Sequence, residues 1–288
     1  MRRLLNVWVL CVGGSFLSAP ANGADWYVSA AAGAVSRAGM DQNGSNREST
    51  CYPTDACFHE VPRPAIAGYR WTYDIDADAG PALRLGIGRR LGRFRIETAV
   101  GWQRNALEQE LIDIAYLDGA PRATADSTVT VDAMALIDDA VTRTVSVDLF
   151  RDLPPIGGSV TPYVGVGVGQ AYITVKGLGF VAEYRDTSQT PPAYDPPLSH
   201  YAAAQEEDHS DSVVTWRVHA GADYALGERT LLGARLTWSV IGSTSDTGRY
   251  DRHPIHATDP AFRNRNGFEE ARAWALTVSL TRWLGGGP

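Results

Sequence analysis

The sequence predicts an all-β fold: an eight-stranded antiparallel transmembrane up-and-down β-barrel with long external loops. Eight segments alternate apolar and polar residues, which is the period of a β-strand with one apolar face. Each segment has about ten residues or more, the length that a tilted strand needs to cross a bilayer, whereas strands of soluble proteins usually have five or six. The connections between the segments alternate between short and long, as they do in outer-membrane barrels.

The alternation recurs along the chain after its first 24 residues. In chain order, the segments cover 25–35, 81–90, 93–103, 140–153, 160–175, 212–226, 229–242 and 271–284. In the second segment, the apolar residues Leu83, Leu85 and Ile87 stand before a tight Arg-Leu-Gly break. The alternation resumes at Phe94 and Ile96 after the break, which predicts a β-hairpin with one continuous apolar face.

The connections are of two kinds. Short breaks with glycine or a Pro-Pro pair stand at 90–92, 152–158 and 226–228. The other four connections, at 36–79, 104–139, 176–211 and 243–270, run to roughly 30 or 40 residues and are rich in Asp, Pro, Ser, Asn and Gly. Four such loops argue against a compact soluble domain. They are expected in an outer-membrane barrel, which has short periplasmic turns and long extracellular loops.

The residues opposite the apolar face distinguish a barrel from a soluble β-sandwich. Glycine stands there at alternate positions, as in Gly165, Gly167 and Gly169, whereas a sandwich would place β-forming residues on its solvent face. Alternating glycines with a few charges suit a narrow polar lumen, and the apolar face then meets lipid. The charged residues predicted to point into the lumen are Arg84, Arg95, Glu97, Asp148, Arg217, His219, Asp223 and Arg235.

These predicted lumen charges have two interpretations. Charges in a dry interior have to be paired, so the simpler one is a structural salt-bridge network. Eight strands leave a lumen that side chains just fill. The alternative is a narrow path for an ion or solute.

Aromatic residues near the strand ends indicate a membrane independently. Amphipathic rings prefer the two interfaces between lipid and water. Two aromatic girdles are predicted from Trp26, Trp102, Tyr172, Trp216, Tyr224, Trp238, Trp274 and Trp283. All of them except Trp283 have the parity of outward-facing residues.

The first 24 residues predict export. Two arginines precede a mostly apolar run of roughly 15 residues that ends in small residues, the layout of a cleavable signal peptide ending at residue 21 to 24. A single barrel domain is then expected over 25–288. In an exported protein the closely spaced Cys51 and Cys57 most simply form a disulfide, with a zinc site as the alternative. The formal net charge of −7 argues against nucleic acid as a partner, and no metal site or cofactor is predicted.

Three stretches carry a resemblance to a known family: "WYVSAAAGAV" in the first segment, "FRIETAVGW" after the tight turn and "TPYVGVGVGQAY" in the fifth segment. Together with the final alternating segment, they resemble the OmpA/OmpX-like eight-stranded outer-membrane barrels, including the opacity and surface-antigen porin-like proteins. The resemblance covers the strands and none of the loops. It implies a bacterial outer-membrane location, with lipid and lipopolysaccharide around the barrel, extracellular loops and periplasmic termini. One departure is the ending "TRWLGGGP", where such proteins usually end on an aromatic residue.

The function expected on this basis is structural or surface interaction, such as adhesion, with the loops contacting a host or surface ligand. A small porin-like channel is the first alternative, and a lipid A-modifying enzyme is the second. Catalysis is not expected from the "HSDS" sequence at 209–212, because His209 and Ser210 would point to opposite faces of a strand. The aromatic residues Phe58, Tyr69 and Trp71, with Tyr73, are candidates for a partner-contacting patch, or they pack within their own loop.

Overall fold

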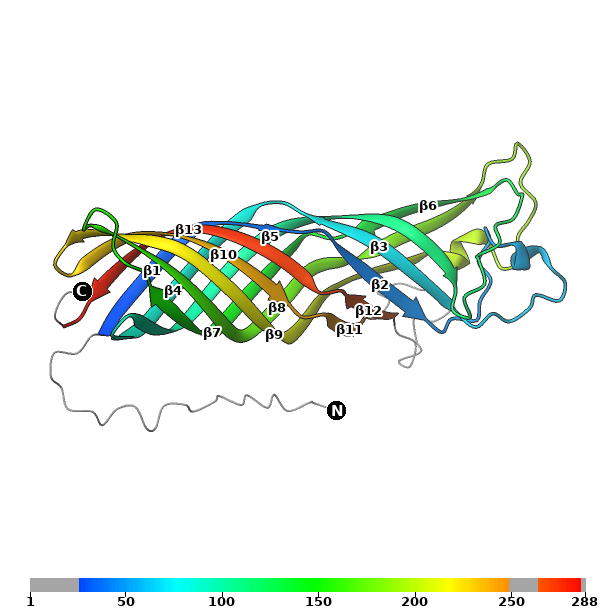
Figure 1. Cartoon of the computed structure of the whole chain (residues 1–288). Helices are drawn as coiled ribbons and strands as arrows, with labels where there is room; N and C mark the ends of the chain where they lie inside the picture. Colours follow the sequence, from blue (N-terminus) through cyan, green and yellow to red (C-terminus); the bar gives the residue numbers. More distant parts are fainter. Residues whose placement is uncertain (1–25, 249–263, 286–288) are drawn as a thin grey trace.

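The computed structural model describes residues 26–248 and 264–285, so the predicted signal peptide lies outside the described residues. The described chain is almost entirely antiparallel β-structure (Figure 1). Its strands are β1 (Trp26–Arg37), β2 (Met40–Asn46), β3 (Tyr69–Ala77), β4 (Gly80–Leu91), β5 (Phe94–Tyr116), β6 (Val129–Leu136), β7 (Asp139–Asp152), β8 (Val160–Asp186), β9 (Ala203–Gly227), β10 (Thr230–Ile241), β11 (Thr244–Gly248), β12 (Asn264–Phe268) and β13 (Ala271–Trp283). Two 3₁₀ turns, η1 (Ala56–His59) and η2 (Leu198–Tyr201), lie in the loops. No helix of the described residues is long and apolar enough to span a membrane.

Eight of these strands close into a ring, which confirms the predicted fold. The order around the ring is β1-β4-β5-β7-β8-β9-β10-β13, and each strand pairs antiparallel with both neighbours. The closing pair joins the first and last strands, for example Ala30 opposite Leu280. Closure matters because it leaves no unpaired strand edge, a requirement for a β-structure in lipid.

The register places the apolar face on the outside of the ring. Leu85, Val147 and Val166 are 60%, 51% and 57% exposed, whereas Glu97 and Asp148 on the alternate positions are at most 1% exposed. Because side chains alternate across a strand, each ring strand has one lipid-type face and one small or polar face. This outside-apolar arrangement is the reverse of that in a water-soluble protein.

The long connections are more ordered than the sequence predicts. Instead of irregular loops at 36–79, 104–139, 176–211 and 243–270, they contain β2, β3, β6, β11 and β12 and the outer halves of β5, β8 and β9. We call this part of the sheet the extension. Its sequences lack the apolar alternation because neither face meets lipid: β2 reads "MDQNGSN" and buries Gln42 and Asn46 on its inner face. Amides pair with one another there, for example Gln42 Nε2 with Asn266 Oδ1 at 3.1 Å.

The extension continues the barrel along its axis, to the right in Figure 1, while the short turns lie at the opposite end. The turn between β4 and β5 needs a left-handed residue, which Gly92 supplies with a φ of 64°. Inside the extension, a cluster of buried apolar residues fills the barrel above the membrane-crossing part. It comprises Met40, Ile75, Leu107, Ala140, Ala171, Ile173, Val175, Leu178, Ile241, Phe268 and Ala271. We call this cluster the apolar plug.

Candidate functional site

The outer surface of the ring carries aromatic side chains at two levels, and they come from the residues predicted to form girdles. At the extension end, Trp216, Trp238 and Trp274 lie side by side, with ring centroids 6.1 Å and 6.5 Å apart. Trp102 and Tyr172 stand at the same level on β5 and β8, each opposite Arg143 of β7. At the turn end, Trp26 and Tyr224 face outward, and the Arg89 guanidinium lies 5.9 Å from the Trp26 ring.

The spacing of the two girdles fits a membrane. Eight residues separate Trp216 from Tyr224 on β9, which is about 26 Å along a strand. A tilt of about 40° reduces this to a band about 20 Å tall, close to the apolar band of outer-membrane barrels.

Trp283 does not belong to a girdle, and here the structure corrects the prediction. It is 3% exposed, lies inside the barrel and meets the Tyr27 ring edge-on at 5.1 Å. Its inward parity, evident from the sequence, explains this position. Together with Tyr27 and Leu231 it forms a small apolar cluster at the turn end of the lumen.

The eight predicted lumen charges all lie inside the ring, although Arg84 is the least buried of them. The most highly connected group is Asp148, which is fully buried. Its carboxylate accepts hydrogen bonds from Arg84 Nη2 at 2.5 Å, Ser146 Oγ at 2.8 Å and His219 Nε2 at 2.9 Å. Because Arg84 also bonds Glu97 Oε1 at 3.0 Å, β4, β5, β7 and β9 are tied together across the lumen.

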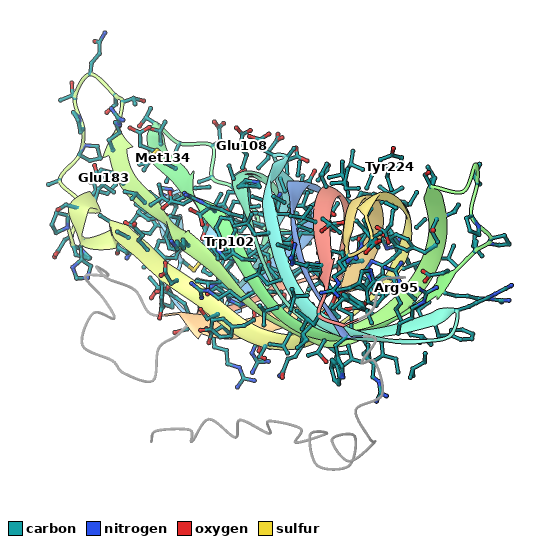
Figure 2. The ribbon with its side chains drawn as sticks, turned by 90° about the vertical axis from the view of Figure 1, so that its left-hand side faces the viewer. Arg95, Trp102, Glu108, Met134, Glu183 and Tyr224 are labelled. Carbon is teal, nitrogen blue, oxygen red and sulfur yellow. A yellow bond between two sulfur atoms is a disulfide. The ribbon has the colours of Figure 1, made fainter. Side chains whose placement is uncertain are left out.

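A second cluster lies nearer the turns and centres on Arg95, which Figure 2 labels. Its guanidinium pairs with Asp223 at 2.9 Å and with Asp152 at 2.8 Å. Sequence reasoning missed Asp152, which it placed in a turn, although the residue has the inward parity of Asp148. Tyr163 was also missed; its hydroxyl accepts a hydrogen bond from Arg235 Nε at 3.1 Å.

The lumen glycines provide space for these contacts. Gly86 lies between Glu97 and Ser29, and a Cβ there would come within 2.7 Å of both side chains. The Ser29 hydroxyl thus reaches Glu97 Oε2 at 3.0 Å across β4. Gly167 lies in the same way beneath Asp148, where a Cβ would overlap the carboxylate. The glycine alternation therefore follows from side chains that cross neighbouring strands.

Three loops meet at the far end of the extension and form what we call the loop cap: residues 47–68, 117–128 and 187–202. Cys51 and Cys57 form a disulfide there, as predicted. Three aromatic side chains pack around the disulfide: Phe58 from the first loop, Tyr201 from the third loop and Tyr184 from β8 beside them. The cap is therefore a folded unit with its own small apolar core.

The second loop joins the cap through a buried ion pair. Asp55 is fully buried, and its carboxylate accepts hydrogen bonds from Arg122 Nε at 2.5 Å and from the Tyr69 hydroxyl at 2.6 Å. Burial and the neighbouring Asp55 charge raise the pKa of Tyr69 well above its ordinary value, so Tyr69 stays a hydrogen-bond donor. Phe58 and Tyr69 are thus buried structural residues of the cap, whereas Trp71 and Tyr73 are half-buried on β3.

The "HSDS" sequence does not assemble a catalytic group. His209 is buried and its Nε2 lies 3.2 Å from Thr244 Oγ1, while the Ser210 hydroxyl bonds Thr174 Oγ1 at 3.2 Å on the other face of β9. Nucleophile and base would need to be within hydrogen-bond reach of each other. Among the described residues, no group of three or more His, Cys, Asp or Glu side chains is placed to hold a metal ion.

Charge is divided unevenly along the barrel axis. The extension and loop cap, at 40–79, 104–139, 176–211, 244–248 and 264–270, contain 25 Asp and Glu residues against eight Lys and Arg residues. Glu108 and Glu183, labelled in Figure 2, belong to this acidic part. The rest of the described chain is rich in arginine, and Arg89, Arg90 and Arg151 stand at the turn end.

Solved structures of similar architecture are outer-membrane proteins. The Neisserial surface protein A is 12% identical, with 91% of this chain and 99% of that chain covered and a TM-score of 0.41. OprG from Pseudomonas aeruginosa is 11% identical, with 90% and 97% covered and a TM-score of 0.45. The outer-membrane protease OmpT from Escherichia coli is 8% identical, with 90% and 96% covered and a TM-score of 0.31. No family model matches the chain, and no curated protein matches it.

The chain has the fold of an eight-stranded outer-membrane β-barrel. This assignment rests on the closed ring, its apolar exterior and its two girdles. The similarity to these solved structures is one of fold.

Proposed function

We propose that this outer-membrane barrel is a non-catalytic surface protein that holds the loop cap outside the cell for contact with a partner. The observation that carries the proposal is the length of the extension. On β5, 14 residues separate Trp102 in the girdle from Tyr116 at the cap, about 46 Å along the strand. With a tilt of about 40°, the cap stands about 35 Å above the girdle.

The filled interior of the barrel favours a surface role rather than a channel function. The membrane-crossing lumen holds the ion pairs of Asp148 and Arg95, and the apolar plug fills the barrel above them. An ion would have to cross both layers. In planar bilayers we expect the purified protein to give no stable conductance steps; steps that persist in symmetrical salt would favour the porin-like alternative.

The acidic extension defines the chemistry of a partner. With 25 carboxylates against eight cationic side chains, it would attract a basic protein surface and repel a polyanion. The buried disulfide and the Asp55–Arg122 pair would keep the cap rigid and so reduce the entropy cost of binding. The lipid A-modifying alternative predicts altered lipid A masses in cells that express the protein, whereas a surface role predicts unchanged masses.

One lysine makes the orientation directly testable. Lys176 is the only lysine in the sequence, and it is exposed on β8, four residues beyond Tyr172 of the girdle. With the loops extracellular and the termini periplasmic, a membrane-impermeant amine reagent should biotinylate Lys176 on intact cells. Mass spectrometry of the tryptic peptides identifies the labelled residue.

A matched variant provides the control. In Lys176→Arg/Arg229→Lys the single lysine moves to the turn between β9 and β10. This variant should be labelled only after the outer membrane is permeabilised. Labelling of the variant, but not of the original protein, on intact cells would show the opposite orientation and overturn the proposal.

A further inference from the structure

Arg217 is one of two buried lumen arginines that have no carboxylate at ion-pair distance among the described residues; the other is Arg37. Arg217 lies on the inner face of β9 and is only 8% exposed. Arg84, Arg95 and Arg235 each reach at least one carboxylate. Across residues 26–248 and 264–285, by contrast, Arg217 has no carboxylate at ion-pair distance, and its Nε has no hydrogen-bond partner. A buried guanidinium without a negative partner destabilises the folded protein, so a nearby negative charge would stabilise it.

The charge balance of the lumen gives the same result. Arg37, at the extension end of β1, is also buried, and its Nη2 donates only to the Thr142 hydroxyl, at 3.0 Å. With Arg37, the described lumen contains five arginines. Four buried carboxylates face the lumen of the ring: Glu97, Asp148, Asp152 and Asp223. The described lumen therefore holds one more arginine than carboxylates.

A small cavity lies beside Arg217. Its volume is about 80 Å³, and among its lining residues are Arg84, Arg217, Arg235 and the hydroxyl side chains of Thr142, Thr215 and Thr237. No carboxylate lines it, so every charged group on its wall is cationic. The ion pairs of Asp148 lie on the turn side of the cavity, and Ile241 of the apolar plug lines it on the other side.

We propose that this cavity is an anion site that binds one small monovalent inorganic anion of the chloride class, held by Arg217. Guanidinium N–H groups and hydroxyls supply donors on several sides, and the single surplus charge matches a single negative charge. A water molecule needs about 10–15 Å³ of such space, so the cavity holds a halide together with a few waters. The anion neutralises the excess positive charge of the lumen and so stabilises the folded barrel.

The site is tested first by anomalous scattering from crystals of the full protein soaked in sodium bromide. We expect a bromide peak within about 3.5 Å of the Arg217 guanidinium, at the distance of a charge-assisted contact. Absence of a peak there, or density for sulfate but not for bromide, would overturn the assignment.

Stability provides the second test. Unfolding in urea is compared in sodium chloride and in sodium gluconate at the same ionic strength, because gluconate is too large for the cavity. A site with a dissociation constant of about 10 mM raises the folded-to-unfolded ratio about tenfold at 100 mM chloride. Equal stability of the original protein in the two salts would contradict the proposal.

Variants separate this site from general salt effects. Arg217→Met should remove the difference between the salts, whereas Arg143→Met, a change on the outer face of β7, should retain it. If Arg217→Met does not fold, Arg217→Lys keeps the charge and should keep a chloride dependence. A chloride effect of unchanged size in Arg217→Met would show that the anion binds elsewhere.

Discussion

Replacing Asp148 by asparagine should destabilise the barrel strongly while leaving its shape unchanged. The substitution removes a fully buried negative charge that accepts three hydrogen bonds, from Arg84, Ser146 and His219. The amide oxygen of asparagine can accept one or two of these bonds, but Arg84 loses one of its two carboxylates. Breaking a buried ion pair by removing one partner costs about 3–5 kcal/mol, and we expect a loss in this range.

The assay is urea unfolding of the protein in lipid vesicles, followed by tryptophan fluorescence and by gel mobility of unheated samples. The matched control is Asp132→Asn, because Asp132 pairs with Arg185 on the exposed surface of the extension. An exposed pair contributes about 0–1 kcal/mol, so this variant should resemble the original protein. If Asp148→Asn also unfolds within about 0.5 kcal/mol of the original protein, the charge network is not what stabilises the lumen.

Three further perturbations test other parts of the structure. Gly167→Ala should cost about 1–3 kcal/mol in the same urea assay, because its Cβ overlaps the Asp148 carboxylate; an unchanged midpoint would show that the carboxylate has room to move. Cys51→Ser/Cys57→Ser should speed trypsin cleavage of the loop cap and leave the heat-modifiable gel mobility of the barrel intact, and equal cleavage rates would contradict a role for the disulfide. Burial lowers the pKa of His209, so the folded extension keeps it neutral while an opened extension binds a proton below about pH 6.5. The stability that neutral His209 gives to its contacts with β11 and β12 is therefore lost as the pH falls from 7 to 5. Hydrogen exchange in β11 and β12 should accelerate over this range, and His209→Gln should show no such pH dependence.

The membrane-crossing strands were predictable because two solvents act on them. Lipid requires an apolar outer face, and the narrow lumen requires small or paired side chains, so Val147 and Asp148 carry opposite signals at neighbouring positions. The extension gave no such signal. Water surrounds it, and buried amides such as Gln42 and Asn266 line parts of its interior, so polar residues occur on both faces and the period disappears.

The sequence predicted which charged residues point into the lumen, but not which of them form ion pairs with one another. Parity identifies which side chains point inward, and Asp152 has inward parity; it was missed because it stands where the predicted strand at 140–153 overlaps the predicted turn at 152–158. It does not specify which carboxylate each arginine reaches. That depends on the stagger of strands around the ring, which places Arg84 beside Asp148 and leaves Arg217 beside a cavity.

The central claim, that the apolar exterior between the girdles meets lipid, is tested most directly by spin labels at single cysteines in the Cys51→Ser/Cys57→Ser background. Labels at Val147 and Val166 lie between the girdles on the outer face, and labels at Asp113 and Asp132 lie on the exposed extension. In lipid vesicles, oxygen should reach the first pair far more readily than a water-soluble nickel complex does, and the preference should reverse for the second pair. Equal access of the nickel complex to Val147, Val166 and Asp113 would contradict the claim.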